Sequence, residues 1–249
     1  MHNPTFLKCD GADTVVIFIH GLFGSPNQFV ELADAVYNMG CTCKCVLLPG
    51  HGGGMSEFAK SGVADWQQHL QNEIDKIKLD HKKIFLVGHS MGGLLALNSS
   101  MLKENNISGV FLIATPLKVH IVDPKSILRK RQLLQLPRDN EIKSAYMKLN
   151  SVKMPKRFVY LPPVRTIREF YKLMKQTEKR LPEVFVPVHM IHSRNDETTS
   201  YKSATLFYKG LRNTQRMTFS LDKSWHAFYY DDEQEIVRDK LMEFIRSAT

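Results

Sequence analysis

The sequence predicts an α/β fold: a mostly parallel central sheet flanked by helices, with a small helical cap inserted into it. Within residues 1–115, apolar runs of strand length alternate with helical patterns, an order typical of parallel strands joined by right-handed crossovers. The alternation stops over residues 116–181, which are basic, and resumes over residues 182–249. We therefore expect residues 1–115 and 182–249 to form one core domain and residues 116–181 to form a cap or lid.

The elements of the first half follow from their apolar patterns. Thr14–Ile19 is a continuous apolar, β-branched run, as expected of a strand covered on both faces. The helices expected at about Asn27–Asn38 and Ala64–Leu79 place apolar residues at helical spacing. The other elements expected here are a strand at Thr42–Leu48, a strand at Ile84–Gly88, a helix to about Lys103 and a strand at Gly109–Ala114.

The cap is expected to contain short helices, such as Asp139–Lys148 and Thr166–Lys179. Its apolar residues recur at helical spacing, which predicts that one helical face lines a pocket; they include Ile127, Leu128, Leu133, Leu134, Ile167, Phe170, Tyr171 and Met174. The core is expected to resume with a strand at Val184–Ile191, a helix near Thr199–Lys209, a strand near Arg216–Leu221 and a closing helix at about Asp231–Ser247.

Composition indicates a globular protein with a sizeable core. The chain has 249 residues, of which 43% are hydrophobic and 24% charged. No apolar run has the length of a membrane span, and Met1–Asp10 lacks the features of a signal peptide, so we expect a cytoplasmic location. Cys41, Cys43 and Cys45 alternate along one predicted strand without metal-site spacing, so they are interpreted as small buried side chains, with no metal site.

The positive charge is concentrated in the cap. The whole chain carries +9, whereas Lys118–Arg180 contains 17 Lys and Arg against 5 Asp and Glu, a net +12, so the remainder carries −3. Such a segment can attract anionic substrates, or it can be a solvated helical face that makes at most weak contact with an anionic membrane surface. No nucleic acid partner is expected, because no binding module accompanies the charge.

The sequence Gly88-His89-Ser90-Met91-Gly92 is a G-x-S-x-G motif between a predicted strand and a predicted helix. This is the context of a nucleophile elbow, in which a sharp turn exposes the serine hydroxyl above the sheet. The turn leaves no room for side chains at Gly88 and Gly92. Ser90 is therefore the predicted nucleophile.

Two further side chains with the required chemistry follow predicted strands, and the ends of parallel strands meet at one edge of a sheet. Asp196 follows the strand at Val184–Ile191, and His226 follows the strand at Arg216–Leu221. We expect His226 to remove the proton of Ser90 and Asp196 to orient the imidazole. The order serine, aspartate, histidine is that of the α/β hydrolases.

An acyl-transfer site also needs N–H donors for the oxyanion. The backbone amides of Met91, directly after the nucleophile, and of Leu22, in the loop after the first strand, are the expected donors. Gly21 lets that loop approach closely, and the substrate pocket is expected to involve Gly21, Phe23, His89 and Trp225.

Other residues could fill the same roles. His20, His51 and His89 also lie at this sheet edge; His20 is expected to brace the oxyanion loop, His51 a turn, and His89 the elbow. Glu197, Asp222 and Asp231 are alternative acids, but Asp196 lies just beyond the end of a buried strand and is preferred.

The chain resembles a bacterial carboxylesterase or monoacylglycerol-lipase-like serine hydrolase of the α/β-hydrolase superfamily. The resemblance rests on motifs that follow one another along the chain: His20–Ser25, Pro49–Gly52, Gly88–Gly93, Arg194–Glu197 and Ser224–His226. It implies Leu22 and Met91 as oxyanion donors and residues 118–180 as a cap over the acyl pocket. Leu22 stands where the family often has an aromatic residue and Trp225 where it often has glycine; both departures reshape the pocket mouth.

The resulting hypothesis is a hydrolase that cleaves carboxylic esters of short-to-medium acyl chains, monoacylglycerols among them, through an acyl-enzyme on Ser90 and without a cofactor. Thioester hydrolysis or acyl transfer by the same residues is one alternative. A ligand-binding protein on a hydrolase scaffold is another, although such a protein usually lacks a triad member or has a blocked oxyanion loop. The expected partner is a small-molecule ester, and no oligomeric state is predicted.

Overall fold

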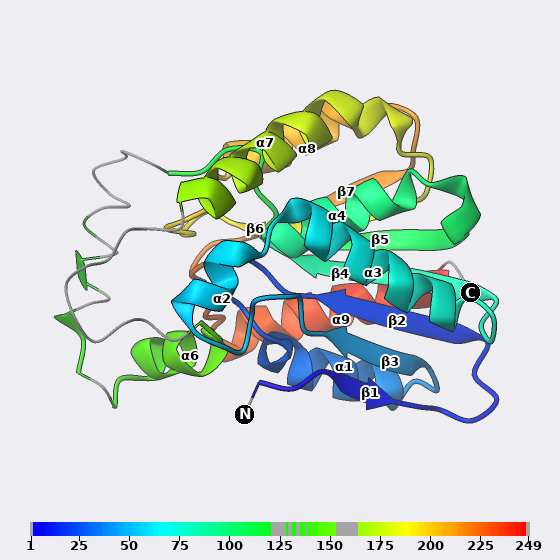
Figure 1. Cartoon of the computed structure of the whole chain (residues 1–249), viewed down its shortest axis with the longest axis horizontal. Helices are drawn as coiled ribbons and strands as arrows, with labels where there is room; N and C mark the ends of the chain where they lie inside the picture. The colour runs from blue at the N-terminus through cyan, green and yellow to red at the C-terminus, as the bar shows by residue number, and fades with distance from the viewer. Residues whose placement is uncertain are drawn as a thin grey trace.

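The computed structural model describes residues 2–120, 128, 131–132, 135–137, 139–152 and 164–247 (Figure 1). Seven strands form one sheet in the order β1-β3-β2-β4-β5-β6-β7. All neighbouring strands pair in parallel except β1, which runs antiparallel to β3. The strands are β1 (Thr5–Leu7), β2 (Thr14–Ile19), β3 (Thr42–Val46), β4 (Lys83–His89), β5 (Ile107–Ile113), β6 (Val188–Ser193) and β7 (Arg216–Leu221). The predicted α/β fold with a mostly parallel sheet is confirmed.

Helices cover both faces of the sheet (Figure 1). The α-helices are α1 (Val30–Tyr37), α2 (Met55–Lys60), α3 (Val63–Ile77), α4 (Met91–Ser100), α6 (Glu141–Leu149), α7 (Val164–Arg180), α8 (Lys202–Gly210) and α9 (Asp231–Ser247). The short 3-10 helices are η1 (Pro26–Phe29), η2 (Lys103–Asn105) and η3 (Leu181–Glu183). Among the described residues, no helix is long and apolar enough to cross a membrane.

The hydrophobic core lies in two layers, one on each face of the sheet. Strand β2 is buried throughout, and its side chains alternate between the layers: Ile17 joins the first and Phe18 the second. The first layer contains side chains of α3, α4, α7 and α8, and the second those of α1 and α9. Because both faces are covered, the central strands are continuous apolar runs, which explains why the sequence pattern located them.

The three cysteines near β3 belong to the second layer. Cys41 precedes the strand, Cys43 and Cys45 lie within it, and all three side chains are buried. Burial raises the pKa of each thiol. Their interpretation as small buried side chains is confirmed.

Three elements differ from the sequence prediction. Strand β6 begins at Val188, because Leu181–Glu183 forms a 3-10 helix with Pro182 in its first turn, and it continues to Ser193. Strand β1 and helix α2 were not predicted. With three and six residues, respectively, they are too short to show a recognisable period.

Helices α6 and α7 lie between β5 and β6 in the chain, inside the segment predicted to be a cap. Ile127, Leu133 and Leu134 lie outside the described residues, and Leu128 is exposed. Much of the apolar face of α7 does not line open space: Phe170, Leu173 and Met174 pack in the first core layer. These side chains pack on the side of α7 that contacts α3 and α4, and a pocket lined by the cap stays a prediction.

Candidate active site

Ser90 lies at a sharp turn between β4 and α4. Its backbone is in the left-handed half of conformational space, with φ 53° and ψ −122°, a strained conformation that is common at functional sites. A Cβ atom at Gly92 would lie 1.9 Å from the carbonyl oxygen of Ile19, and one at Gly88 would lie 2.4 Å from Gly93. Only glycine fits at either position. The local sequence therefore builds an elbow around Ser90.

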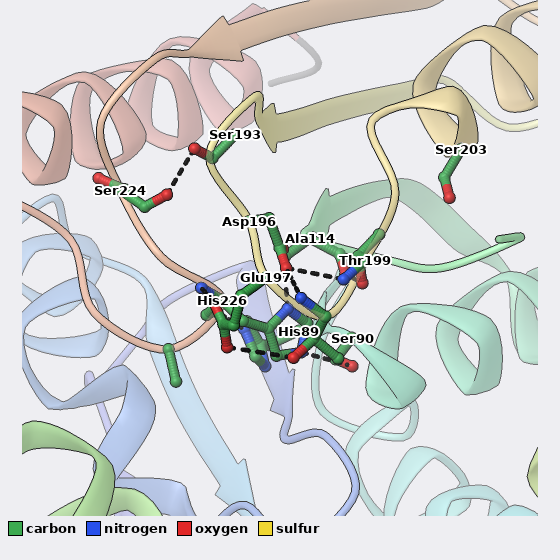
Figure 2. Close-up of polar contacts among 12 residues, drawn as sticks. His89, Ser90, Ala114, Ser193, Asp196, Glu197, Thr199, Ser203, Ser224 and His226 are labelled. Carbon is green, nitrogen blue, oxygen red and sulfur yellow. Dashed lines mark hydrogen bonds and ion pairs between the residues drawn. The ribbon is translucent and has the colours of Figure 1, made fainter. Parts of the chain in front are cut away.

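The structure brings Ser90, His226 and Asp196 together from three loops at the same sheet edge (Figure 2). The Nε2 atom of His226 lies 3.0 Å from Oγ of Ser90, and its Nδ1 atom lies 2.8 Å from Oδ2 of Asp196. Only 12% of the His226 side chain and 2% of the Asp196 side chain are exposed. This is a continuous hydrogen-bonded line from carboxylate to imidazole to hydroxyl.

Asp196 is held as a carboxylate. Burial opposes its ionisation, but His226 and the amides of Thr198 and Thr199, each 2.7 Å from Oδ1, outweigh that effect and lower its pKa. A carboxylate accepts a hydrogen bond from Nδ1–H of His226. The lone pair then lies on Nε2, the atom that faces the hydroxyl of Ser90.

The loop that carries His226 is anchored by groups that sequence reasoning missed. The buried carboxylate of Glu233 accepts hydrogen bonds from the amides of Asp222, Lys223 and Ser224, at 2.7–2.9 Å. The amide of Trp225 donates to the carbonyl of Phe228, 2.8 Å away, and closes the turn. A glutamate in the first turn of a helix gives no sequence signal for this role, since first turns are commonly acidic.

Glu197, the alternative acid, binds the backbone of His226. Its Oε2 atom accepts a hydrogen bond from the backbone amide of His226 at 2.9 Å, and its Oε1 atom accepts one from the hydroxyl of Tyr146 at 2.6 Å. The structure thus places Asp196 at the ring and Glu197 at the backbone of the same histidine. The exposed Asp222 forms an ion pair with Arg194 instead.

The loop after β2 packs directly against the elbow. A Cβ atom at Gly21 would lie 2.9 Å from Cβ of Ser90, so glycine is needed for this approach. The loop turns tightly, with the amide of Gly24 donating to the carbonyl of Gly21 at 2.9 Å, and Phe23 adopts a positive φ of 63°. Gly21, the residue before Leu22, therefore lies against Ser90, and Met91 begins α4 directly after Ser90.

Three other histidines at this edge form hydrogen bonds with the backbone. His89 donates from Nε2 to the carbonyl of His226 at 2.8 Å, and burial lowers its pKa to about 3. Nε2 of His20 accepts from the amide of Leu48 at 3.0 Å, and its Nδ1 atom lies 2.9 Å from the carbonyl of Gly21. His51 contacts the carbonyl of Pro49. These contacts agree with the roles expected for the three residues, namely to brace the elbow, the oxyanion loop and a turn.

Comparisons with known proteins agree with this architecture. Residues 10–233 match the Hydrolase_4 family, described as serine aminopeptidase, S33. The chain belongs to this family. It is similar to a thermostable monoacylglycerol lipase from Bacillus sp., with 25% identity over 232 residues that cover 92% of this chain and 89% of the relative.

Solved structures show the same fold. One, from work on the metagenome-derived lipolytic enzymes LipS and LipT, has a TM-score of 0.77 and 23% identity, and covers 99% of this chain and 98% of that chain. A monoacylglycerol lipase from Paleococcus ferrophilus has a TM-score of 0.74 and 17% identity, with 99% of both chains covered. The prediction of an α/β-hydrolase enzyme related to lipases and esterases is confirmed.

Proposed function

We propose that this hydrolase cleaves carboxylic esters with short-to-medium acyl chains, monoacylglycerols among them, through an acyl-enzyme on Ser90. The observation that carries the proposal is the line of hydrogen bonds from Asp196 through His226 to Ser90. The relative from Bacillus sp. is named a monoacylglycerol lipase, which supports this substrate class. The intact line of contacts argues against a ligand-binding protein that has lost its chemistry.

The chemistry follows from the positions of the three side chains. His226 removes the proton of Ser90 as Oγ attacks the ester carbonyl carbon, and Asp196 stabilises the imidazolium that forms. When the tetrahedral intermediate collapses, the C–O bond to the alcohol breaks and His226 gives the proton to the leaving oxygen. Water then repeats the sequence on the acyl-enzyme and releases the carboxylic acid.

The amides of Leu22 and Met91 are proposed to stabilise the oxyanion. Met91 is the first residue of α4, so its amide belongs to the positive end of the helix dipole. The close contact of Gly21 with Ser90 brings the loop that carries Leu22 to the same place. Donors fixed by the backbone need no rearrangement when the negative charge develops, which is why such sites lower the barrier effectively.

A cavity of about 830 Å³ lies between α6, η1 and the start of α9, and its lining includes His89, Ala227 and Leu149. Ser90, His226 and Met91 do not line it, so it is not the proposed ester site. We propose that Phe23 and Trp225 shape the mouth of the acyl site next to Ser90, with Tyr171 of the cap.

Hydrolysis should decline as the pH falls below about 6–7, the range in which imidazole side chains generally take up a proton, because a protonated His226 cannot accept the proton of Ser90. Neighbouring histidines should not contribute, since burial lowers the pKa of His89 to about 3 and that of His192 to about 4. A plot of log kcat/KM against pH should therefore have an acid limb with a slope of one. A slope of two above pH ~5 would contradict this assignment.

Replacing Phe23 by alanine should raise KM for medium-chain p-nitrophenyl esters by roughly tenfold, because the acyl chain loses an apolar contact, while hydrolysis of the acetate changes little. Phe23 is half-buried and packs on Phe58, with 4.7 Å between ring centroids. Phe185→Ala is the matched control, because the ring of Phe185 is exposed and the residue is distant in sequence from the oxyanion loop. An unchanged chain-length profile in Phe23→Ala would remove this residue from the acyl site.

The same assay tests the proposed weak contact of the basic cap with anionic membranes. The medium-chain ester is presented in neutral and in anionic vesicles, and salt is raised through about 0.1–0.5 M, where the Debye length falls below 10 Å. Salt should slow hydrolysis only in the anionic vesicles. Equal salt dependence in both would mean that the positive charge of the cap is only a solvated surface.

A further inference from the structure

We infer that Glu197 and Tyr146 form a pair of positioning residues through which helix α6 holds the backbone of the catalytic histidine. This inference rests on the proposed function of Ser90, Asp196 and His226. It assigns a role to a second buried carboxylate in the site and to a side chain of the inserted segment, neither of which takes part in the proton transfers.

The two acids of the Asp196-Glu197 pair act on different parts of one residue. Asp196 binds the imidazole ring of His226, and Glu197 accepts the backbone amide of His226 at 2.9 Å. Glu197 is only 2% exposed although it follows directly after the catalytic acid. Burying a carboxylate costs free energy unless hydrogen bonds compensate for the lost water. The groups that donate hydrogen bonds to Glu197 therefore indicate its role.

Tyr146 fixes that carboxylate from α6. Its hydroxyl donates to Oε1 of Glu197 at 2.6 Å and lies 3.4 Å from the amide of Ala227, the residue after the catalytic histidine. Thr198 also donates to Oε1, at 3.1 Å. The backbone on both sides of the Cα atom of His226 is thereby tied, directly or through one hydroxyl, to a single carboxylate.

Helix α6 is itself attached to the core near the site. Its last turn is followed by Ser151, which is buried and whose amide donates to the carbonyl of Phe23 in the oxyanion loop at 2.9 Å. The side chain of Asn27 lies 3.4 Å from the carbonyl of Lys148. One short stretch of the insertion, Tyr146–Ser151, therefore contacts both the histidine loop and the oxyanion loop, which argues that it supports catalysis and does not open as a free lid.

The pair predicts a specific pattern of kinetics. Per active site, Tyr146→Phe should lower kcat by roughly threefold to tenfold, and Glu197→Gln should lower it by roughly tenfold to fiftyfold, because each variant loses a hydrogen bond that orients a catalytic group. KM for p-nitrophenyl butyrate should change less than roughly twofold in both. The double variant should be no slower than Glu197→Gln within about twofold, because Tyr146 acts through Glu197.

A charge effect should separate Glu197 from a merely structural residue. The charged and titratable groups around His226 in the described structure include Asp196, Glu197, His89, His192, Tyr146 and, against the same carboxylates, Tyr229. Removing the negative charge of Glu197 disfavours the imidazolium, so the acid limb of kcat/KM in Glu197→Gln should move to lower pH. Tyr146→Phe retains that charge and should not move the limb in this direction.

The test measures ester hydrolysis and the rate at which a fluorophosphonate labels Ser90, both normalised to the fraction of sites labelled at completion. Tyr37→Phe and Glu243→Gln, at exposed positions on α1 and α9, are matched controls and should behave as wild type. Thermal unfolding of each variant checks that the fold is intact.

Additive losses in the double variant, a change in KM alone, or wild-type labelling rates in both single variants would overturn the inference. Normalising to labelled sites removes the effect of a partly unfolded sample, so a residue that only stabilises the fold would leave these rates unchanged. Failure of the proposed function has a different signature: wild-type protein that labels at Ser90 but cleaves no ester. The labelling rates of the variants still test the positioning pair in that case.

Discussion

Ser90→Ala should reduce ester hydrolysis by roughly 10³-fold or more while leaving the fold intact. Without the hydroxyl no acyl-enzyme can form, and only the contributions of the oxyanion donors and of substrate binding remain. Ser90 is 6% exposed and its side chain donates to no group other than the imidazole in the described structure, so a methyl group fits the same space. Thermal unfolding should therefore change little.

The measurement has two parts. Hydrolysis of p-nitrophenyl butyrate gives the rate, and mass spectrometry locates the adduct of a fluorophosphonate, which should be at Ser90 in the wild type and absent from the variant. Ser56→Ala, at an exposed position on α2, is the matched control and should be labelled and active. An adduct on another residue, or an active Ser90→Ala variant, would refute the assignment of the nucleophile.

Asp196→Asn should lower kcat by about 10⁴-fold, close to the effect of removing the nucleophile. The amide has nearly the shape of the carboxylate, but it can donate a hydrogen bond to Nδ1 of His226. The proton then moves to Nε2, and the ring presents N–H to Ser90 where a lone pair is required. The loss of the negative charge also removes the group that stabilises the imidazolium.

The other acid residues near the histidine in sequence supply the controls. Asp222→Asn should be nearly as active as wild type, because Asp222 is exposed and its side chain pairs with Arg194. Glu197→Gln should be impaired far less than Asp196→Asn, since Glu197 contacts the backbone of His226. A variant of Asp222 or Glu197 that is more severely impaired than Asp196→Asn would show that the acid has been assigned to the wrong residue.

Much of the fold and of the proposed site could be predicted from local sequence patterns. The strands at the centre of the sheet are apolar runs because both of their faces are covered, and parallel strands place their following loops at one edge. The elbow at Ser90 is visible because its glycines are required by steric contacts that any such turn creates. Since the elbow locates the serine and parallel strands end at one edge, Asp196 and His226 could be predicted as its partners from their positions directly after two strands.

The choice between Asp196 and Glu197 shows where sequence reasoning reached its limit. Both acids lie in the same loop, and the sequence favoured Asp196 only by its distance from a strand end. The roles of the two carboxylates, one at the ring and one at the backbone of His226, depend on the direction in which each side chain leaves a turn. A turn of irregular geometry has no period from which that direction can be predicted.

Only the tertiary structure decided how the inserted segment contributes. The spacing of Phe170 and Met174 predicted an apolar face on α7 correctly, but not that the core would fill it. The contact of Tyr146 with Glu197 joins residues 51 positions apart, and that of Ser151 with Gly24 joins residues 127 positions apart. Local periodicity predicts which face of a helix is apolar. Which residues that face packs against, and which group the hydroxyl of Tyr146 contacts, depend on the packing of segments that are distant in sequence.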